Sequence, residues 1–411
     1  MGLVYLFLLV VEVCVICRIE KQMWGTYLTP AVCLSVPTTI IIILAVIYSN
    51  CTPLMKNFYL PSLIVWMIGF ALFMIPSFMA RASLKCNRAI PQGVYRYKSD
   101  DFYVIITAIA LAIGLFNMMR IRGAINSTML TLGSDELSEE LEATGLLAHM
   151  GQLRNALFPY FMLKADRKHK MAFVVIAISL VSMFAGASKS WIIIPLFAGY
   201  LLRIIAGKTK FSLRALFIIA LSGVAIFFLS YTLIMVVTGK IEFSERFFTF
   251  VGNHFSVYLL GSVESFSIDY QQGIVEPEMT VSLFAPIVNL WKVLTDSGPL
   301  VEHINPVFLS IGELGETNVR GGLGTIMCYS QDWLVYVTVV LLGGLYNYFI
   351  MLLSKVRQDI FTTSAYIYNL AFLAFSFFEF YWLNLSAYEL PIICLVFGLF
   401  FSKNNKIGKY A

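Results

Sequence analysis

The chain has 411 residues, of which 59% are hydrophobic and only 13% are charged. Soluble proteins average about 25% charged residues, so this composition argues against a soluble enzyme and for a polytopic membrane protein. The net charge of +5 comes without a basic tract interleaved with aromatic residues, which argues against a nucleic-acid partner. Backbone polar groups inside a bilayer must be hydrogen-bonded within the spanning segment, so the spans are expected to be helices.

Apolar runs recur along the sequence from its first residues. About 20 apolar residues cross the hydrocarbon core as a helix, and the sequence predicts about eleven such spans. In chain order they lie near Gly2–Cys17, Leu28–Tyr48, Phe58–Ala80, Phe102–Met119, Gly145–Leu163, Met171–Ala187, Trp191–Ala206, Ala215–Val237, Trp333–Leu353, Thr362–Phe378 and Leu390–Phe401. The expected fold is an all-α polytopic membrane protein, with helices over residues 1–238 and 332–411 and one large external loop over 239–331.

The placement of lysine and arginine predicts the orientation. These residues accumulate on the cytoplasmic side of membrane proteins. Alternate connectors, beginning with the one that holds Arg18 and Lys21, carry 20 of the 29 cations, and the opposite connectors carry eight. We therefore expect a cytoplasmic C-terminus and an external loop from Gly239 to Gln331. Because binding and catalysis favour loops held on a rigid scaffold, this loop is the expected working surface.

Two cations stand where the usual distribution does not place them. Arg154 falls within a predicted span, together with His149, Gln152 and Asn155. A charge in the membrane is costly and usually lines a cavity or pairs with a partner, so Arg154 either serves function or forms a structural pair with an acid. Lys189 lies at a tight external turn, where it either serves function or extends to the interface.

A glycine-rich stretch precedes the span that begins at Trp333. Residues 311–324 hold five glycines and Arg320, and Asp332 follows at the mouth of the span. Glycine lets backbone N–H groups turn toward an anion, and arginine binds phosphate oxygens in a bidentate manner. This pattern favours an anion site near the external membrane surface. A flexible loop leading back into the membrane is the simpler interpretation.

Motifs for other chemistries are absent from the sequence. The turn Gly186-Ala187-Ser188-Lys189-Ser190 ends like a Walker A loop but lacks the glycine that must precede the lysine. The four histidines have no spacing typical of metal ligands, and Cys14 with Cys17 lies inside a predicted span, where packing is the expected role. We therefore expect no metal and no cofactor.

Three short stretches, in this layout of spans and loop, resemble those of a known family. Ala187-Ser188-Lys189-Ser190 opens a span, and Thr317-Asn318-Val319-Arg320 is followed by Asp332-Trp333. The chain thus resembles Wzy-type polymerases of O-antigen and capsular polysaccharide, which are multi-pass proteins of the bacterial inner membrane with a large periplasmic loop. Arginine is commoner in that family at the place where this chain has Lys189.

The resemblance implies a metal-independent glycosyltransferase that joins undecaprenyl-pyrophosphate-linked oligosaccharide units at the periplasmic face. Its partners would be that lipid-linked substrate, the bilayer and a chain-length regulator protein. Such a reaction needs a group that activates the acceptor hydroxyl and cations that stabilise the departing pyrophosphate. The candidates for the base are Asp332, Glu313 and His303. The candidates for the pyrophosphate contacts are the external or membrane-embedded cations Arg320, Arg154, Lys189 and Arg246.

Two other functions share parts of this layout. An O-antigen ligase uses the same lipid donor but hands the polymer to the lipid A core. A flippase or another transporter should show paired halves, broken helices at the midplane and charges deep in several spans. Here the polar sequence is concentrated in the external loop, which favours chemistry at the outer face over transport.

Overall fold

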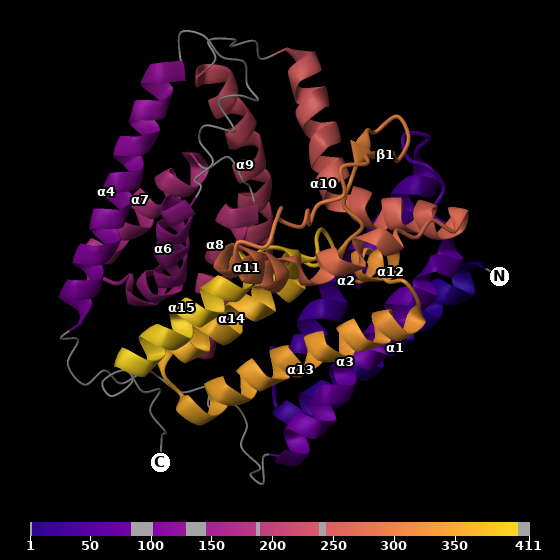
Figure 1. The fold of residues 1–411 in the computed structure, drawn as a ribbon, viewed down its shortest axis with the longest axis horizontal. Coiled ribbons are helices and arrows are strands. Elements are labelled where there is room, and N and C mark those ends of the chain that lie inside the picture. The colour runs from indigo at the N-terminus through magenta and orange to yellow at the C-terminus, as the bar shows by residue number, and fades with distance from the viewer. Residues whose placement is uncertain (1, 84–101, 129–144, 186–189, 238–243, 402–411) are drawn as a thin grey trace. The chain divides into compact units, whose positions relative to one another are not determined.

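The computed structural model describes residues 2–83, 102–128, 145–185, 190–237 and 244–401. It is 79% helical with almost no strand, which confirms the helical fold class (Figure 1). Three helical stretches are long and apolar enough to cross a membrane, namely Pro30–Cys51, Leu60–Ser83 and Trp333–Arg357. Each overlaps a span predicted from the sequence. The further apolar helical stretches among the described residues, such as Tyr103–Met119 and Phe217–Leu229, have 10–17 residues each, so eleven spans of full length are not shown.

The chain divides into two compact units. The first unit holds Met1–Ile90, Gly252–Leu353 and Asn369–Tyr388, and the second holds Pro91–Val251, Ser354–Tyr368 and Glu389–Ala411. Four helices run from one unit into the other, namely α10 (Glu245–Gln272), α13 (Trp333–Arg357), α14 (Ile360–Ala374) and α15 (Ser386–Phe401).

The N-terminal part of the first unit is a group of three helices, α1 (Gly2–Trp24), α2 (Pro30–Cys51) and α3 (Leu63–Ser83), with the short 3-10 helix η1 (Leu60–Ser62) before α3. The three helices lie side by side (Figure 1). Proline at the first position of α2 suits a helix start, because its missing N–H would have no partner there. The indole of Trp24 is buried and donates to Ser77 Oγ at 2.9 Å, which fixes the end of α1 against α3.

The segment predicted as a large loop is folded wherever it is described. After α10 come η2 (Pro277–Phe284), α11 (Ala285–Thr295), the two-residue strands β1 (Leu309–Ser310) and β2 (Glu316–Thr317), and α12 (Gly322–Tyr329). The strands pair antiparallel, with Leu309 opposite Thr317. In the first unit this segment packs on the connector after α2, because Lys56 N donates to Ile311 O and Leu314 N donates to Leu54 O. It is therefore an ordered part of that unit.

The second unit contains α4 (Tyr103–Thr128), α6 (Gly145–Lys164), α7 (Lys170–Ala185), α8 (Ser190–Ile205) and α9 (Leu213–Val237). Helix α6 packs against both α7 and α8. Part of the core of this unit is formed by Phe158, Met183, Ile192 and Ile226. The remaining short element, η3 (Tyr381–Leu383), belongs to the first unit and lies between α14 and α15.

Candidate functional site

Helix α10 carries an unusual run of buried polar side chains. Residues 261–269 are all buried, and they include Ser262, Glu264, Ser265, Ser267 and Asp269. Ser262, Ser265 and Asp269 recur at helical spacing, so they share one face of α10. A buried polar group needs a hydrogen-bond partner. The segments that pack on this face of α10 must therefore supply partners for these side chains.

Arg320 meets that face of α10 through Asp269. The Arg320 side chain is only 3% exposed, and its Nε donates to Asp269 Oδ2 at 2.7 Å. Its Nη1 donates to the carbonyl of Asn318 at 2.8 Å, and its Nη2 lies 3.9 Å from Glu276 Oε1. The guanidinium therefore already has two acidic neighbours and a carbonyl in the folded protein.

The pKa values of this ion pair reflect burial. Burial raises the pKa of Asp269 above its usual value, although the bond to Arg320 acts in the opposite direction. Burial alone would lower the pKa of Arg320, but the hydrogen bond and the charge of Asp269 raise it above its ordinary value. Arg320 stays charged and holds its carboxylate partner, so the pair ties the start of α12 to α10.

Asn305 extends this network to the segment before β1. Its Nδ2 lies 2.6 Å from both Glu276 Oε1 and Oε2, and its carbonyl accepts from Asn318 Nδ2 at 2.9 Å. Ser282 Oγ donates to Glu302 O at 2.6 Å, which holds the same segment to η2. These contacts fix the backbone on both sides of His303.

A second polar group forms around His303. The Asn384 amide donates to Glu379 Oε1 at 2.8 Å and also hydrogen-bonds His303. His303, Asn384 and Glu379 are each partly exposed. Tyr258 of α10 stacks on Phe378 with the ring centroids 5.2 Å apart, beside this group. We call His303, Asn384, Glu379 and Tyr258 the His303 cluster.

Burial shifts the pKa values of the His303 cluster in directions that suit proton transfer. It lowers the pKa of His303 below its usual value, although the hydrogen bond with Asn384 raises it, so the imidazole is neutral at pH 7 and can accept a proton. Burial also raises the pKa of Glu379, although the bond from Asn384 lowers it. Burial and the charge of Glu379 raise the pKa of Tyr258. Groups with displaced pKa values in a partly open site are candidates for chemistry.

We call Arg320, Asp269, Glu276 and Asn305 the Arg320 network. Hydrogen bonds to backbone carbonyls join this network to the His303 cluster within the first unit. Gly322 N donates to Ser376 O, and Ser262 Oγ donates to Phe377 O. Gly321 has a φ of 67°, and a Cβ atom there would lie 2.9 Å from Phe377 O. Only glycine allows this approach without strain. The segment after Arg320 is thus fixed to the turn that leads to Glu379.

The other two base candidates lie outside the His303 cluster. Glu313 is exposed in the turn between β1 and β2. Asp332 is exposed before α13, and its Oδ1 accepts from Val335 N at 2.9 Å, which is the contact of a helix cap. Of the three residues predicted as bases, His303 therefore has the surroundings best suited to the role.

The remaining predicted cations belong to the second unit or lie outside the described residues. Arg154 in α6 is 8% exposed, and its guanidinium donates to Asn155 Oδ1 and Ser182 Oγ. Within the described ranges these acceptors are neutral, and no carboxylate reaches Arg154. Arg246 is exposed in the first turn of α10. Lys189 lies outside the described residues.

Glycines of the glycine-rich stretch allow close packing of the backbone. Gly312 has a φ of 124°, and a Cβ atom there would lie 2.6 Å from Leu54 O. The amide of Gly322 is engaged by Ser376 O. The sequence pattern singled out this stretch but did not indicate Asn384, Glu379, Asn305 and Asp269 as partners. No local motif connects Glu379 and Asp269 to Arg320 or His303.

Comparison with known proteins gives one family. A model described as a family of unknown function (DUF6337) matches residues 54–407. The matched range includes the Arg320 network, the His303 cluster and Arg154. No curated protein and no solved structure matches the chain.

Proposed function

The chain belongs to this family, whose description names no activity, and we propose from the His303 cluster that it is a membrane-bound glycosyltransferase. In this proposal it polymerises undecaprenyl-pyrophosphate-linked oligosaccharide repeat units into O-antigen or capsular polysaccharide. The reaction takes place at the periplasmic face of a bacterial inner membrane. The C-terminus of the chain lies on the cytoplasmic side of that membrane in this proposal. A chain-length regulator protein is the proposed protein partner.

The observation that carries the proposal is a neutral, partly exposed imidazole that hydrogen-bonds the Asn384 amide, which in turn donates to the Glu379 carboxyl. His303 takes the proton of the acceptor sugar hydroxyl while that oxygen forms a bond to the anomeric carbon of the donor chain. The bond from that carbon to the lipid pyrophosphate breaks, and its electron pair leaves with the pyrophosphate. A positioned base of this kind contributes about 10²- to 10⁴-fold to such a reaction.

Asn384 and Glu379 act as positioning residues in this scheme. The amide of Asn384 fixes the imidazole, and its other hydrogen bond to Glu379 fixes the amide. Arg320 is assigned a supporting role as well, because its guanidinium is already paired with Asp269. Arg154 is kept as a proposed pyrophosphate contact on the sequence argument alone, because a cation within a predicted span is costly unless it has a role there. We assign Arg246 and Lys189 assisting roles at the same anion.

The test uses the full-length protein in detergent with purified lipid-linked repeat units as both donor and acceptor. We expect His303→Gln to slow chain elongation by at least about 100-fold while the protein elutes and melts as the wild type does. His169→Gln is the matched control, because His169 pairs with Asp166 outside the His303 cluster. Elongation by His303→Gln at the wild-type rate would refute the assignment of the base.

The same assay separates the alternative functions. Adding lipid A core as acceptor distinguishes a ligase, which would transfer polymer to the core and would not extend lipid-linked units. Reconstituted vesicles with labelled lipid-linked units on one leaflet distinguish a flippase, which would move the label without forming glycosidic bonds. Elongation in detergent, where there are no separate compartments, supports the polymerase.

A further inference from the structure

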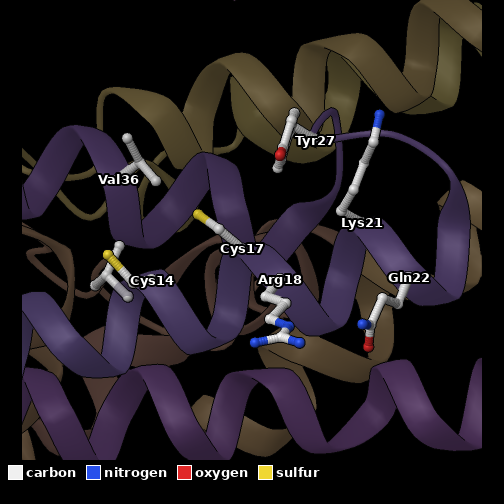
Figure 2. Close-up of a pocket in the computed structure, with 8 residues that line it drawn as sticks. Cys14, Cys17, Arg18, Lys21, Gln22, Tyr27 and Val36 are labelled. Carbon is white, nitrogen blue, oxygen red and sulfur yellow. The ribbon is translucent and has the colours of Figure 1, made fainter.

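A cavity of about 470 Å³ lies between α1 and α2 in the first unit. Eight residues line it, and none of them is acidic: Val13, Cys14, Cys17, Arg18, Lys21, Gln22, Tyr27 and Val36. Figure 2 shows Cys14 and Val36 at one end of this group and Lys21 and Gln22 at the other. The cavity thus has a largely apolar end and an end rich in hydrogen-bond donors.

The spacing along α1 explains why the cations gather on this side. Cys14, Cys17 and Lys21 follow one another at intervals of three and four residues, and Arg18 lies four residues after Cys14 and three before Lys21, so all four share one helical face. Glu20 belongs to another face, where it is fully buried and accepts from the hydroxyl of Tyr348 at 2.8 Å. The acid nearest to Arg18 and Lys21 in the sequence is therefore engaged elsewhere.

The donors at the polar end match the oxygens of a phosphate ester. Arg18, Lys21 and Gln22 are exposed, and Lys21 Nζ lies 4.8 Å from the centre of the Tyr27 ring. Guanidinium, ammonium, amide and phenol groups all donate hydrogen bonds, and the first two carry positive charge. Two cations and no acid select an anion over a zwitterion.

The apolar end indicates that this anion carries acyl chains. Val13 and Val36 form apolar walls of the cavity, and the same two helices expose Val10, Val11 and Ile40 beyond it. Tyrosine and lysine at the end of an apolar helix are typical of the boundary between headgroups and hydrocarbon. A headgroup bound at Arg18 and Lys21 could extend its chains along these exposed side chains.

We propose that the cavity between α1 and α2 binds the headgroup of an anionic phospholipid of the surrounding bilayer. The ligand class is a phosphodiester lipid with a net negative charge, such as phosphatidylglycerol. Basic pockets between membrane helices are suited to such headgroups. None of the residues that line this cavity belongs to the His303 cluster. The lipid-binding proposal therefore does not depend on the proposed transferase activity.

The test titrates lipid-depleted full-length protein in neutral detergent with phosphatidylglycerol and, in parallel, with phosphatidylcholine. We expect saturable binding of phosphatidylglycerol only, and we expect Arg18→Gln/Lys21→Gln to weaken it by roughly 25-fold, since each cation near a lipid surface contributes about a factor of five. Arg167→Gln/Lys168→Gln is the matched control, because it removes two exposed cations outside the cavity.

A second variant guards against a folding defect in the charge-removing variant. Val36→Trp fills the cavity and keeps both cations, and it should weaken binding with an unchanged melting temperature. Equal binding by the wild type, the charge-removing variant and Val36→Trp would overturn the proposal, as would equal binding of phosphatidylcholine. Displacement of the lipid by millimolar inorganic phosphate would overturn it too, because the site would then select a soluble anion.

Discussion

Glu264 is the side chain in α10 whose burial has the clearest consequence. It is 0% exposed, and neither oxygen of its carboxyl has a hydrogen-bond partner among the described residues. Burial raises the pKa of Glu264 to about 8, although Lys56 acts in the opposite direction. The folded protein therefore holds a proton at neutral pH that the unfolded chain releases, because the usual pKa is 4.5.

The sign of the pH dependence follows from this difference. Between pH 4.5 and about 8 the folded protein binds more protons than the unfolded chain, so its stability falls as the pH rises through that window. We expect Glu264→Gln, which cannot ionise, to melt at a higher temperature than the wild type at pH 9 and to lose part of the pH dependence. Glu278→Gln, at an exposed position, is the control. Parallel melting curves of wild type and Glu264→Gln from pH 5 to 9 would contradict this account.

The ion pair of Arg320 and Asp269 gives a test of coupling. Removing one member of a buried pair leaves an uncompensated charge, which costs about 3–5 kcal/mol. We expect Arg320→Met to destabilise the protein by that amount, and Asp269→Leu/Arg320→Met to be more stable than the sum of the two single changes predicts. The measurement is unfolding by denaturant in detergent, with Arg167→Met as the exposed control. Additive effects would show that the 2.7 Å contact carries no coupling energy.

Sequence patterns could identify single residues of the site but not their partners. Arg320 and His303 were predicted because a cation beside glycines and a histidine in a polar segment are visible locally. Glu379 bonds Asn384, yet no local motif indicates that Asn384 also bonds His303. Contacts such as Arg320 with Asp269, which are 51 residues apart, depend on tertiary packing that no local periodicity encodes.

At the scale of elements, the helix α12 depends on the backbone conformation at Gly321. The φ of 67° and the 2.9 Å approach to Phe377 O leave no room for a side chain. We expect Gly321→Ala to destabilise the protein by at least about 1 kcal/mol, because the left-handed conformation alone costs a residue with a Cβ atom that much. It should also slow elongation, since the contact joins the Arg320 network to the His303 cluster.

Gly252 provides the contrast on α10. A Cβ atom there would meet nothing within 4 Å, and alanine in a helix interior is favoured over glycine by about 1 kcal/mol. Gly252→Ala should therefore leave the melting temperature equal or raise it, in the same thermal measurement. A similar loss of stability in both variants would contradict the assigned role of Gly321.

The elements themselves were predictable to different degrees. The spans at Leu28–Tyr48 and Trp333–Leu353 correspond to α2 and α13, because continuous apolar runs are a strong signal. The 28-residue helix α10 was missed within the predicted loop, because its polar side chains break an apolar pattern. Those side chains are buried through tertiary contacts, which reverses the usual relation between polarity and exposure.

At the scale of the whole molecule, the predicted orientation is the feature most open to a direct test. Positive charge predicts that the connector after α6 is cytoplasmic and that the segment holding α11 is periplasmic. Ser297 and Lys168 are exposed in these two segments and suit labelling. In a background with the seven native cysteines replaced, we expect a membrane-impermeant maleimide to modify Ser297→Cys in intact cells. Lys168→Cys should react only after the inner membrane is opened.

The two labelling results bear on the function as well as on the topology. The polymerase proposal needs His303 on the same side as Ser297, because both residues lie between α11 and β1 and lipid-linked units are joined in the periplasm. Labelling of Ser297→Cys only in opened cells would place that segment in the cytoplasm. A cytoplasmic site would have no access to lipid-linked units that have already moved across the membrane. That result would rule out the proposed reaction, although the contacts within the His303 cluster would remain as described.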